Sequence, residues 1–138
     1  MGVFAYNNVM ALIQIKALPQ KSNIRMHKVL KVLCEEVASR LGRLPVGFRA
    51  TFSVFAAGDY VEGSSAVKVQ PQSTHPPLVA FFAMEGMSDM EKENAMRTVS
   101  EVLEREFGLS AGNVHITFHE TKAGHSFSNG RMNYHFSG

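Results

Sequence analysis

The sequence of 138 residues has a single cysteine, no long hydrophobic run and no strong excess of charge of either sign. One cysteine, Cys34, excludes an internal disulfide framework and is typical of proteins from a reducing compartment. No apolar run approaches the roughly 20 residues that span a bilayer. The first ten residues lack the basic start and apolar core of a secretory signal. We therefore expect a soluble, cytoplasmic protein that does not bind membranes.

The charge balance also bears on partners. Fourteen Lys and Arg face twelve Asp and Glu, which gives a formal net charge of +2, and the basic residues are scattered along the chain. Nucleic-acid binding proteins usually concentrate their basic residues in one patch or stripe, so we expect no nucleic-acid partner. The hydrophobic content of 45% is enough for one domain with a real core, or for two small halves that share one.

The chain repeats itself. Shifted by 66 positions, the segment 11–64 lies over the segment 77–130 without a gap, and the matches include Leu12 on Leu78, Glu35 on Glu101 and Thr51-Phe52 on Thr117-Phe118. We interpret residues 1–138 as a single domain built from these two repeats. An N-terminal hairpin extension covers 1–10, with its turn at Asn7-Asn8, and a C-terminal tail covers 131–138.

The first repeat has the pattern strand, helix, strand. Residues Leu12 to Leu18 alternate between apolar and polar, as a half-buried strand does. An apolar stripe at three- and four-residue spacing then predicts a helix, which we expect Ser22 to cap and Gly42 to end in a left-handed conformation. The stripe consists of Leu30, Leu33, Val37 and Leu41. A second alternating strand is predicted from Phe48 to Phe55.

The second repeat gives the same pattern with stronger features. Residues Leu78 to Met84 are all apolar, as expected for a strand covered on both faces. Ser88 and Glu91 have the spacing of a capping box at a helix start, and Gly108 lies at the predicted end. The helix stripe consists of Met96, Val99, Leu103 and Phe107. The last strand of the repeat is predicted over 114–120.

Together these patterns predict an α+β fold. A helical crossover makes the two strands of each repeat parallel, and right-handed connection is the strong default. The tandem βαβ repeat then forms one four-stranded mixed sheet with two helices on one face. Because the other face of the sheet has no helix to cover it, we expect the chain to associate with copies of itself.

On these motifs the chain resembles the tautomerase superfamily. The segment Pro77 to Gly130 is most similar to a 4-oxalocrotonate tautomerase subunit: a proline opens the strand, Glu85-Gly86 precedes Ser88-Asp89, and Glu120 leads into "KAGHSFSNG". The fused pair resembles the larger members of the superfamily, such as the macrophage migration inhibitory factor and carboxymethyl-hydroxymuconate isomerase types. The resemblance implies a homotrimer with this fold.

The resemblance also implies a mechanism that the sequence does not supply as written. In the family, an N-terminal proline amine of lowered pKa moves a proton between the carbons of an enol or keto acid. Here Pro77 follows Pro76, so its nitrogen is an amide. Its counterpart in the first repeat is Ala11, which ten residues precede. Ala11 is therefore a catalytic candidate only if processing at Met10 frees its amine.

The resemblance implies substrate-binding residues in the first repeat. The family positions fall on Arg49, Lys21 and Tyr60 there, and on His115, Met87 and Ser126 in the second repeat. A different interpretation is open for each of the first three. Arg49 is also compatible with a solvated strand position or an interface ion pair, Lys21 with simple exposure, and Tyr60 with a surface turn or a subunit contact.

No metal or cofactor is predicted. His115 and His119 share a strand face, but positions four apart on one strand lie roughly 13 Å apart, which is too far to share one ion. Cys34 lies in the apolar part of the predicted first helix and is expected to pack as a small hydrophobic residue.

Two functions remain open from the sequence. The first is a keto-enol tautomerase or isomerase of small 2-oxo or enol carboxylic acids, with weak or lost activity. The alternative is a non-catalytic trimeric module on the tautomerase fold, with a structural or small-acid-binding role. The partners expected are further copies of the chain and a small carboxylate.

Overall fold

A computed structural model of the chain describes residues 11–21 and 23–134. The hairpin predicted over residues 1–10 lies outside this part. The elements, in chain order, are β1 (Ala11–Ala17), α1 (Met26–Arg40), β2 (Phe48–Val54), β3 (Val61–Glu62), β4 (Ser65–Ala66), β5 (Leu78–Met84), α2 (Asp89–Phe107), β6 (His115–Thr121), β7 (Ser126–Ser128) and β8 (Arg131–Asn133).

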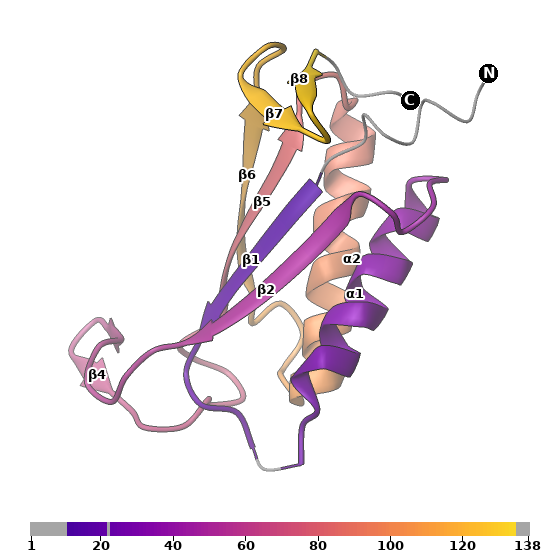
Figure 1. Cartoon of the computed structure of the whole chain (residues 1–138). Coiled ribbons are helices and arrows are strands. Elements are labelled where there is room, and N and C mark those ends of the chain that lie inside the picture. Colours follow the sequence, from indigo (N-terminus) through magenta and orange to yellow (C-terminus); the bar gives the residue numbers. More distant parts are fainter. Residues whose placement is uncertain (1–10, 22, 135–138) are drawn as a thin grey trace.

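The four long strands form one sheet in the order β2-β1-β5-β6. β1 pairs with β2 in parallel, β5 pairs with β6 in parallel, and β1 pairs with β5 antiparallel at the centre. Both helices lie side by side on the same face of this sheet (Figure 1). The predicted α+β fold, with a mixed four-stranded sheet and two helices on one face, is confirmed. Because the repeats meet antiparallel, equivalent positions of the two repeats lie at opposite ends of the sheet.

The core lies between the helices and the sheet. Alternate residues of β1 and β5 point into it, and Ile13 and Phe81 are fully buried there. From the helices, Leu33 of α1 and Leu103 of α2 are fully buried as well, as the apolar stripes predicted. The Phe81 ring stacks on that of Phe118 at a centroid distance of 5.2 Å. One continuous core therefore holds both repeats together.

The helix ends agree with the sequence in three places and differ in one. Gly42 has φ 69°, its N–H donates to the Ser39 carbonyl, and the Arg43 N–H donates to the Ala38 carbonyl, which is a Schellman motif. Gly108 is likewise left-handed, and the capping box at the start of α2 is formed.

α1 begins at Met26 and its N-cap is Arg25, which makes no side-chain capping bond, so the prediction of Ser22 as its cap is wrong; Ser22 itself lies outside the described residues. The apolar stripe fixed the body of this helix but not its first turn. Pro19, which follows β1, contacts the linker: its carbonyl accepts from the Gln70 N–H at 2.9 Å.

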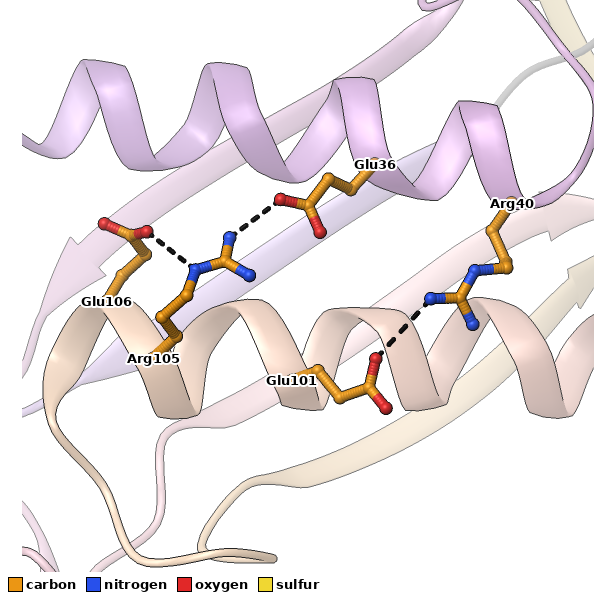
Figure 2. Close-up of polar contacts among 5 residues, drawn as sticks. All are labelled: Glu36, Arg40, Glu101, Arg105 and Glu106. Atoms are coloured by element: carbon orange, nitrogen blue, oxygen red, sulfur yellow. Dashed lines mark hydrogen bonds and ion pairs between the residues drawn. The ribbon is translucent and has the colours of Figure 1, made fainter.

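Ion pairs connect the solvent side of the two helices. Arg105 of α2 donates to Glu36 of α1 at 2.7 Å and to Glu106 at 3.1 Å, and Arg40 lies 3.6 Å from Glu101 (Figure 2). These side chains are about half exposed, so each pair contributes about 0–1 kcal/mol. The buried core, not these pairs, holds the helices in place. In the described part of the chain neither helix is long and apolar enough to cross a membrane.

The linker between the repeats is ordered around a buried histidine. His75 is 1% exposed and has φ 48°, a conformation that is unfavourable for a residue with a side chain. Its Nε2 donates to the Ser65 carbonyl at 2.8 Å, and its backbone N–H donates to Glu62 at 2.6 Å. The Gln70 amide in turn donates to the His75 carbonyl at 2.9 Å. These bonds fold the linker into a small lobe that contains the β3–β4 hairpin at one end of the sheet (Figure 1).

Candidate functional site

The sheet face without helices, hereafter the free face, carries side chains in rows that follow the strand register. Leu12 of β1 lies opposite Arg49 of β2 and opposite Phe82 of β5. Phe82 lies opposite His119 of β6, and their rings stack at 4.7 Å. Arg49 and Phe82 are therefore two strands apart on the same surface. At a strand spacing of about 4.8 Å, their backbones are about 10 Å apart.

A cavity of about 290 Å³ opens at this row, and we call it the Ala11–Arg49 cavity. Its walls come from the start of β1, the end of β5 and the β7–β8 hairpin. The lining residues are Ala11, Leu12, Arg49, Phe82, Ala83, Met84, Thr121, Ser126, Phe127, Ser128 and Asn133. Arg49 is the one charged residue among them, and most of the others are apolar or carry a hydroxyl group.

Arg49 is available to a ligand. Its side chain is exposed at the second position of β2, and it makes no hydrogen bond or ion pair with any residue in the ranges 11–21 and 23–134. A guanidinium presents a planar fork of donors that matches the two oxygens of a carboxylate. The arrangement therefore suits a monoanionic group with an apolar body.

The Ala11 nitrogen lies at the edge of the same cavity but is not a base. It is the amide that joins Met10 to Ala11, and its N–H donates to the Gly47 carbonyl at 3.2 Å. The Ala11 side chain is 4% exposed and faces the core. Proton transfer at this atom therefore requires a chain that begins at Ala11.

The β7–β8 hairpin forms a wall of the cavity that the sequence analysis missed. Asn129 and Gly130 have φ values of 53° and 78°, which is the geometry of a type I′ turn. Behind the turn, the buried Asn133 amide donates to the hydroxyls of Ser126 at 3.0 Å and Ser128 at 2.9 Å. An Asn-Gly dipeptide between short strands is a strong hairpin pattern, so the sequence did contain this information.

Lys21 and Tyr60 lie at the opposite end of the sheet from Ala11. Lys21 follows the end of β1 and is exposed, and a strand of seven residues is roughly 20 Å long. Tyr60 follows the end of β2, where its hydroxyl donates to the Pro76 carbonyl at 2.7 Å. Within one chain, only Arg49 of the three predicted binding residues reaches the Ala11–Arg49 cavity.

Tyr60 belongs instead to the linker lobe. Its ring packs between Phe55 and His75, at centroid distances of 4.9 and 5.2 Å. Burial, and to a lesser extent the nearby Glu62 carboxylate, raises the pKa of the Tyr60 hydroxyl above its ordinary value of 10.0. The hydroxyl is therefore a neutral donor that holds the entry to β5.

The described residues bring no three His, Cys, Asp or Glu side chains together as a metal site. The Cys34 thiol packs on the strand below, with its sulfur 3.5 Å from the Phe48 carbonyl oxygen. Burial, and next the Glu35 carboxylate, raises the pKa of the Cys34 thiol above 9.0. Such a thiol is a poor nucleophile, because the thiolate is the reactive form.

Comparison with solved structures gives strong matches. A fused 4-OT, solved as an asymmetric trimer, matches with a TM-score of 0.77 at 11% identity, over 88% of this chain and 95% of that chain. Pt0534 inactivated by 2-oxo-3-pentynoate matches with a TM-score of 0.75 at 15% identity, over 88% and 95%. N1, a member of the cis-3-chloroacrylic acid dehalogenase family, matches with a TM-score of 0.72 at 10% identity, over 90% and 84%. No protein-family model matches the sequence, and neither does any curated protein. At these identities the matches show the fold.

Proposed function

Since the chain has the fold of the tautomerase superfamily, we propose that its Ala11–Arg49 cavity binds a small organic carboxylate. The observation that carries this proposal is the single unpaired guanidinium of Arg49 among the described lining residues, set against the apolar side chains of Leu12, Phe82 and Phe127. A charge beside apolar walls acts through a lower effective dielectric than in water, which strengthens its hold on an anion. The volume of about 290 Å³ is near the lower limit for small-molecule sites.

The chemical class follows from the lining. One cation binds one carboxylate, and the apolar walls favour an alkyl or aromatic body. The hydroxyls of Thr121 and Ser128 line the same cavity and supply polar contacts for a second oxygen, such as that of a 2-oxo group. The inactivation of Pt0534 by 2-oxo-3-pentynoate supports a 2-oxo acid as the ligand class on this fold.

Binding is tested by calorimetry with phenylpyruvate and with its methyl ester. Arg49→Gln removes the charge and keeps a similar side-chain length. Loss of a charge-assisted hydrogen bond of about 1.5–3 kcal/mol should weaken phenylpyruvate binding by about 10- to 150-fold. Arg40→Gln makes the same change on the helix side of the protein and should leave binding unchanged. Equal affinity of Arg49→Gln and the unaltered chain would refute the site, as would equal affinity for acid and ester.

The second candidate function is keto-enol tautomerisation by an Ala11 amine. It is favoured by the position of Ala11 in the lining of the cavity, one residue before Leu12, which pairs with Arg49. A free α-amino group has an ordinary pKa of about 7.7–8.0, so roughly a tenth of it is neutral near pH 7, and this neutral form can move a proton between the oxygen and carbon of an enol acid. Arg49 would hold the carboxylate during this transfer.

Two forms of the protein separate this function from binding alone. The chain that begins at Met1 and the form that begins at Ala11, each verified by intact mass, are compared in the ketonisation of phenylenolpyruvate. We expect turnover only from the form with a free Ala11 amine, and its loss on N-acetylation. Equal turnover by both forms would exclude the amine mechanism while leaving the carboxylate site intact.

We also propose that the chain assembles as a trimer. The supporting observations are the uncovered free face and the trimeric state of the fused 4-OT structures. In such an assembly, Lys21 and Tyr60 could serve only the cavity of another copy, because they lie at the far end of their own sheet. Sedimentation analysis of the full chain tests this state.

A further inference from the structure

The opposite end of the free face carries a second groove, which is separate from the Ala11–Arg49 cavity. It has a volume of about 400 Å³ and lies where β1 and β2 end and β5 and β6 begin. The strand register places its side chains in two rows across the sheet: Ser53, Lys16, Leu78 and His115 in one, and Thr51, Gln14, Ala80 and Thr117 in the other. We call it the Lys16–His115 groove.

The repeat relates this groove to the Ala11–Arg49 cavity. A shift of 66 positions carries Leu12 onto Leu78, which is the central residue of each row. The same shift carries Arg49 onto His115, and Lys16 onto Phe82. The two sites therefore have the same backbone arrangement, but the position that Phe82 occupies in the Ala11–Arg49 cavity is occupied by Lys16 in the groove.

The charge of the groove has one sign. No acidic residue is among its lining residues, and neither Lys16 nor His115 makes an ion pair within the described part of the chain. The Lys16 ammonium lies 4.9 Å from the centroid of the Phe55 ring, a contact that positions the head group and leaves its donors free.

Polar groups surround these two side chains. The hydroxyls of Ser53 and Thr51 and the amide of Gln14 line the groove, and none of these side chains forms a hydrogen bond with residues 11–21 or 23–134. The Thr117 hydroxyl is already bonded to His119 Nε2 at 2.8 Å. The groove therefore offers one permanent cation, an imidazole and several neutral donors.

We propose that the Lys16–His115 groove binds the phosphate group of a small phosphorylated molecule. Lys16 and His115 lie two strands apart with Leu78 between them, so their Cα atoms are about 10 Å apart. Both side chains are long enough to meet over Leu78 on one tetrahedral anion once the Lys16 ammonium leaves the Phe55 ring, which lies on the β2 side of β1. An ammonium binds phosphate as a point charge, whereas the planar fork of Arg49 suits a carboxylate. The groove is larger than a phosphate ion, and its hydroxyl and amide row provides contacts for a polar organic part.

The test uses the full chain in its native assembly, in which the part of the free face that carries the groove must stay open to the ligand. Inorganic phosphate and glycerol 3-phosphate are titrated at constant ionic strength, with chloride as the reference anion, and binding is followed by amide shifts in NMR spectra. We expect saturable shifts at the end of β1 and the starts of β5 and β6. Lys16→Gln should weaken phosphate binding by about fivefold, the loss expected for one exposed charge contact, and His115→Gln should also weaken it.

A control variant makes the result decisive. Lys31→Gln removes an exposed lysine from α1 and should leave phosphate binding unchanged. The proposal is overturned by unsaturable shifts that depend only on ionic strength, by an equal loss in Lys31→Gln, or by the absence of binding in the assembled protein. Circular dichroism of each variant confirms that the exposed substitutions leave the fold intact.

Discussion

The two helices begin differently, and this difference predicts opposite effects of serine at their N-caps. At the start of α2, the Ser88 hydroxyl accepts from the Glu91 N–H at 3.1 Å, and Glu91 accepts from the Ser88 N–H at 2.9 Å. At the start of α1, the cap residue Arg25 makes no such bond, and no acidic residue lies in the first turn. The helix dipole favours negative charge at this position, so α1 lacks both forms of support.

Ser88→Ala should lower the free energy of unfolding by about 1 kcal/mol. Cap substitutions of this kind cost about 0.5–2 kcal/mol, and the lower half applies here because both capping bonds are exposed and water can replace them in part. Arg25→Ser should raise the free energy of unfolding by up to about 1 kcal/mol. The new hydroxyl can accept an orphan N–H of the first turn, and the change also removes a cation from the positive end of the helix.

Urea unfolding followed by circular dichroism measures both effects. All variants are compared at one protein concentration, because the apparent stability of an oligomer depends on concentration. Ser39→Ala is the matched control: it makes the same chemical change at an exposed position inside α1, where alanine is the better helix former. A loss of stability in Ser39→Ala equal to that in Ser88→Ala, or destabilisation by Arg25→Ser, would refute the capping argument.

Two further predictions concern the end of α1 and its thiol. Gly42→Ala should lower the free energy of unfolding by about 1–2 kcal/mol, because alanine is unfavourable at φ 69°. A Cβ at this position would meet nothing within 4 Å, so the cost comes from the backbone conformation alone. An unchanged free energy of unfolding would show that the backbone adjusts. Cys34 should react with iodoacetamide more slowly in the folded chain than in urea, since the raised pKa lowers the thiolate fraction. The raised pKa of Cys34 also determines how stability depends on pH. Above pH 9.0 the unfolded chain loses this proton before the folded chain does, so stability should fall as the pH rises further.

The fold could be predicted from the sequence because its information is periodic. The alternation in β1 and the apolar run of β5 gave the strands, and the three- and four-residue stripes gave both helices. The start of α1 could not be predicted in this way. Residues between β1 and α1 contact residues that are distant in the sequence; the Gln20 amide, for example, donates to Gln70 at 3.2 Å. Local sequence propensity does not predict such contacts.

The candidate site divides in the same manner. Arg49 beside Ala11 follows from strand register, which is regular and can be counted along the sequence. The buried His75 network depends on Glu62, Ser65 and Gln70 meeting across a loop, and no short pattern indicates it. The β7–β8 hairpin, in contrast, is predicted by the Asn129-Gly130 dipeptide. Because it follows β6 closely in the chain, its place beside the cavity follows from the end of β6.

The antiparallel junction of the repeats explains how one sheet face can hold two different sites. Because β1 and β5 run in opposite directions, the row of Arg49 and the row of His115 lie at opposite ends of the free face. Leu12 and Lys16 are four positions apart on β1, or roughly 13 Å, which exceeds the screening length of about 10 Å at 0.1 M salt. Charge changes at one end therefore have little effect on the other, and sites separated in this way usually combine additively. In the double variant Arg49→Gln, Lys16→Gln, each ligand should lose only the affinity that its own single variant loses, and coupling between the two would mean that they share one site.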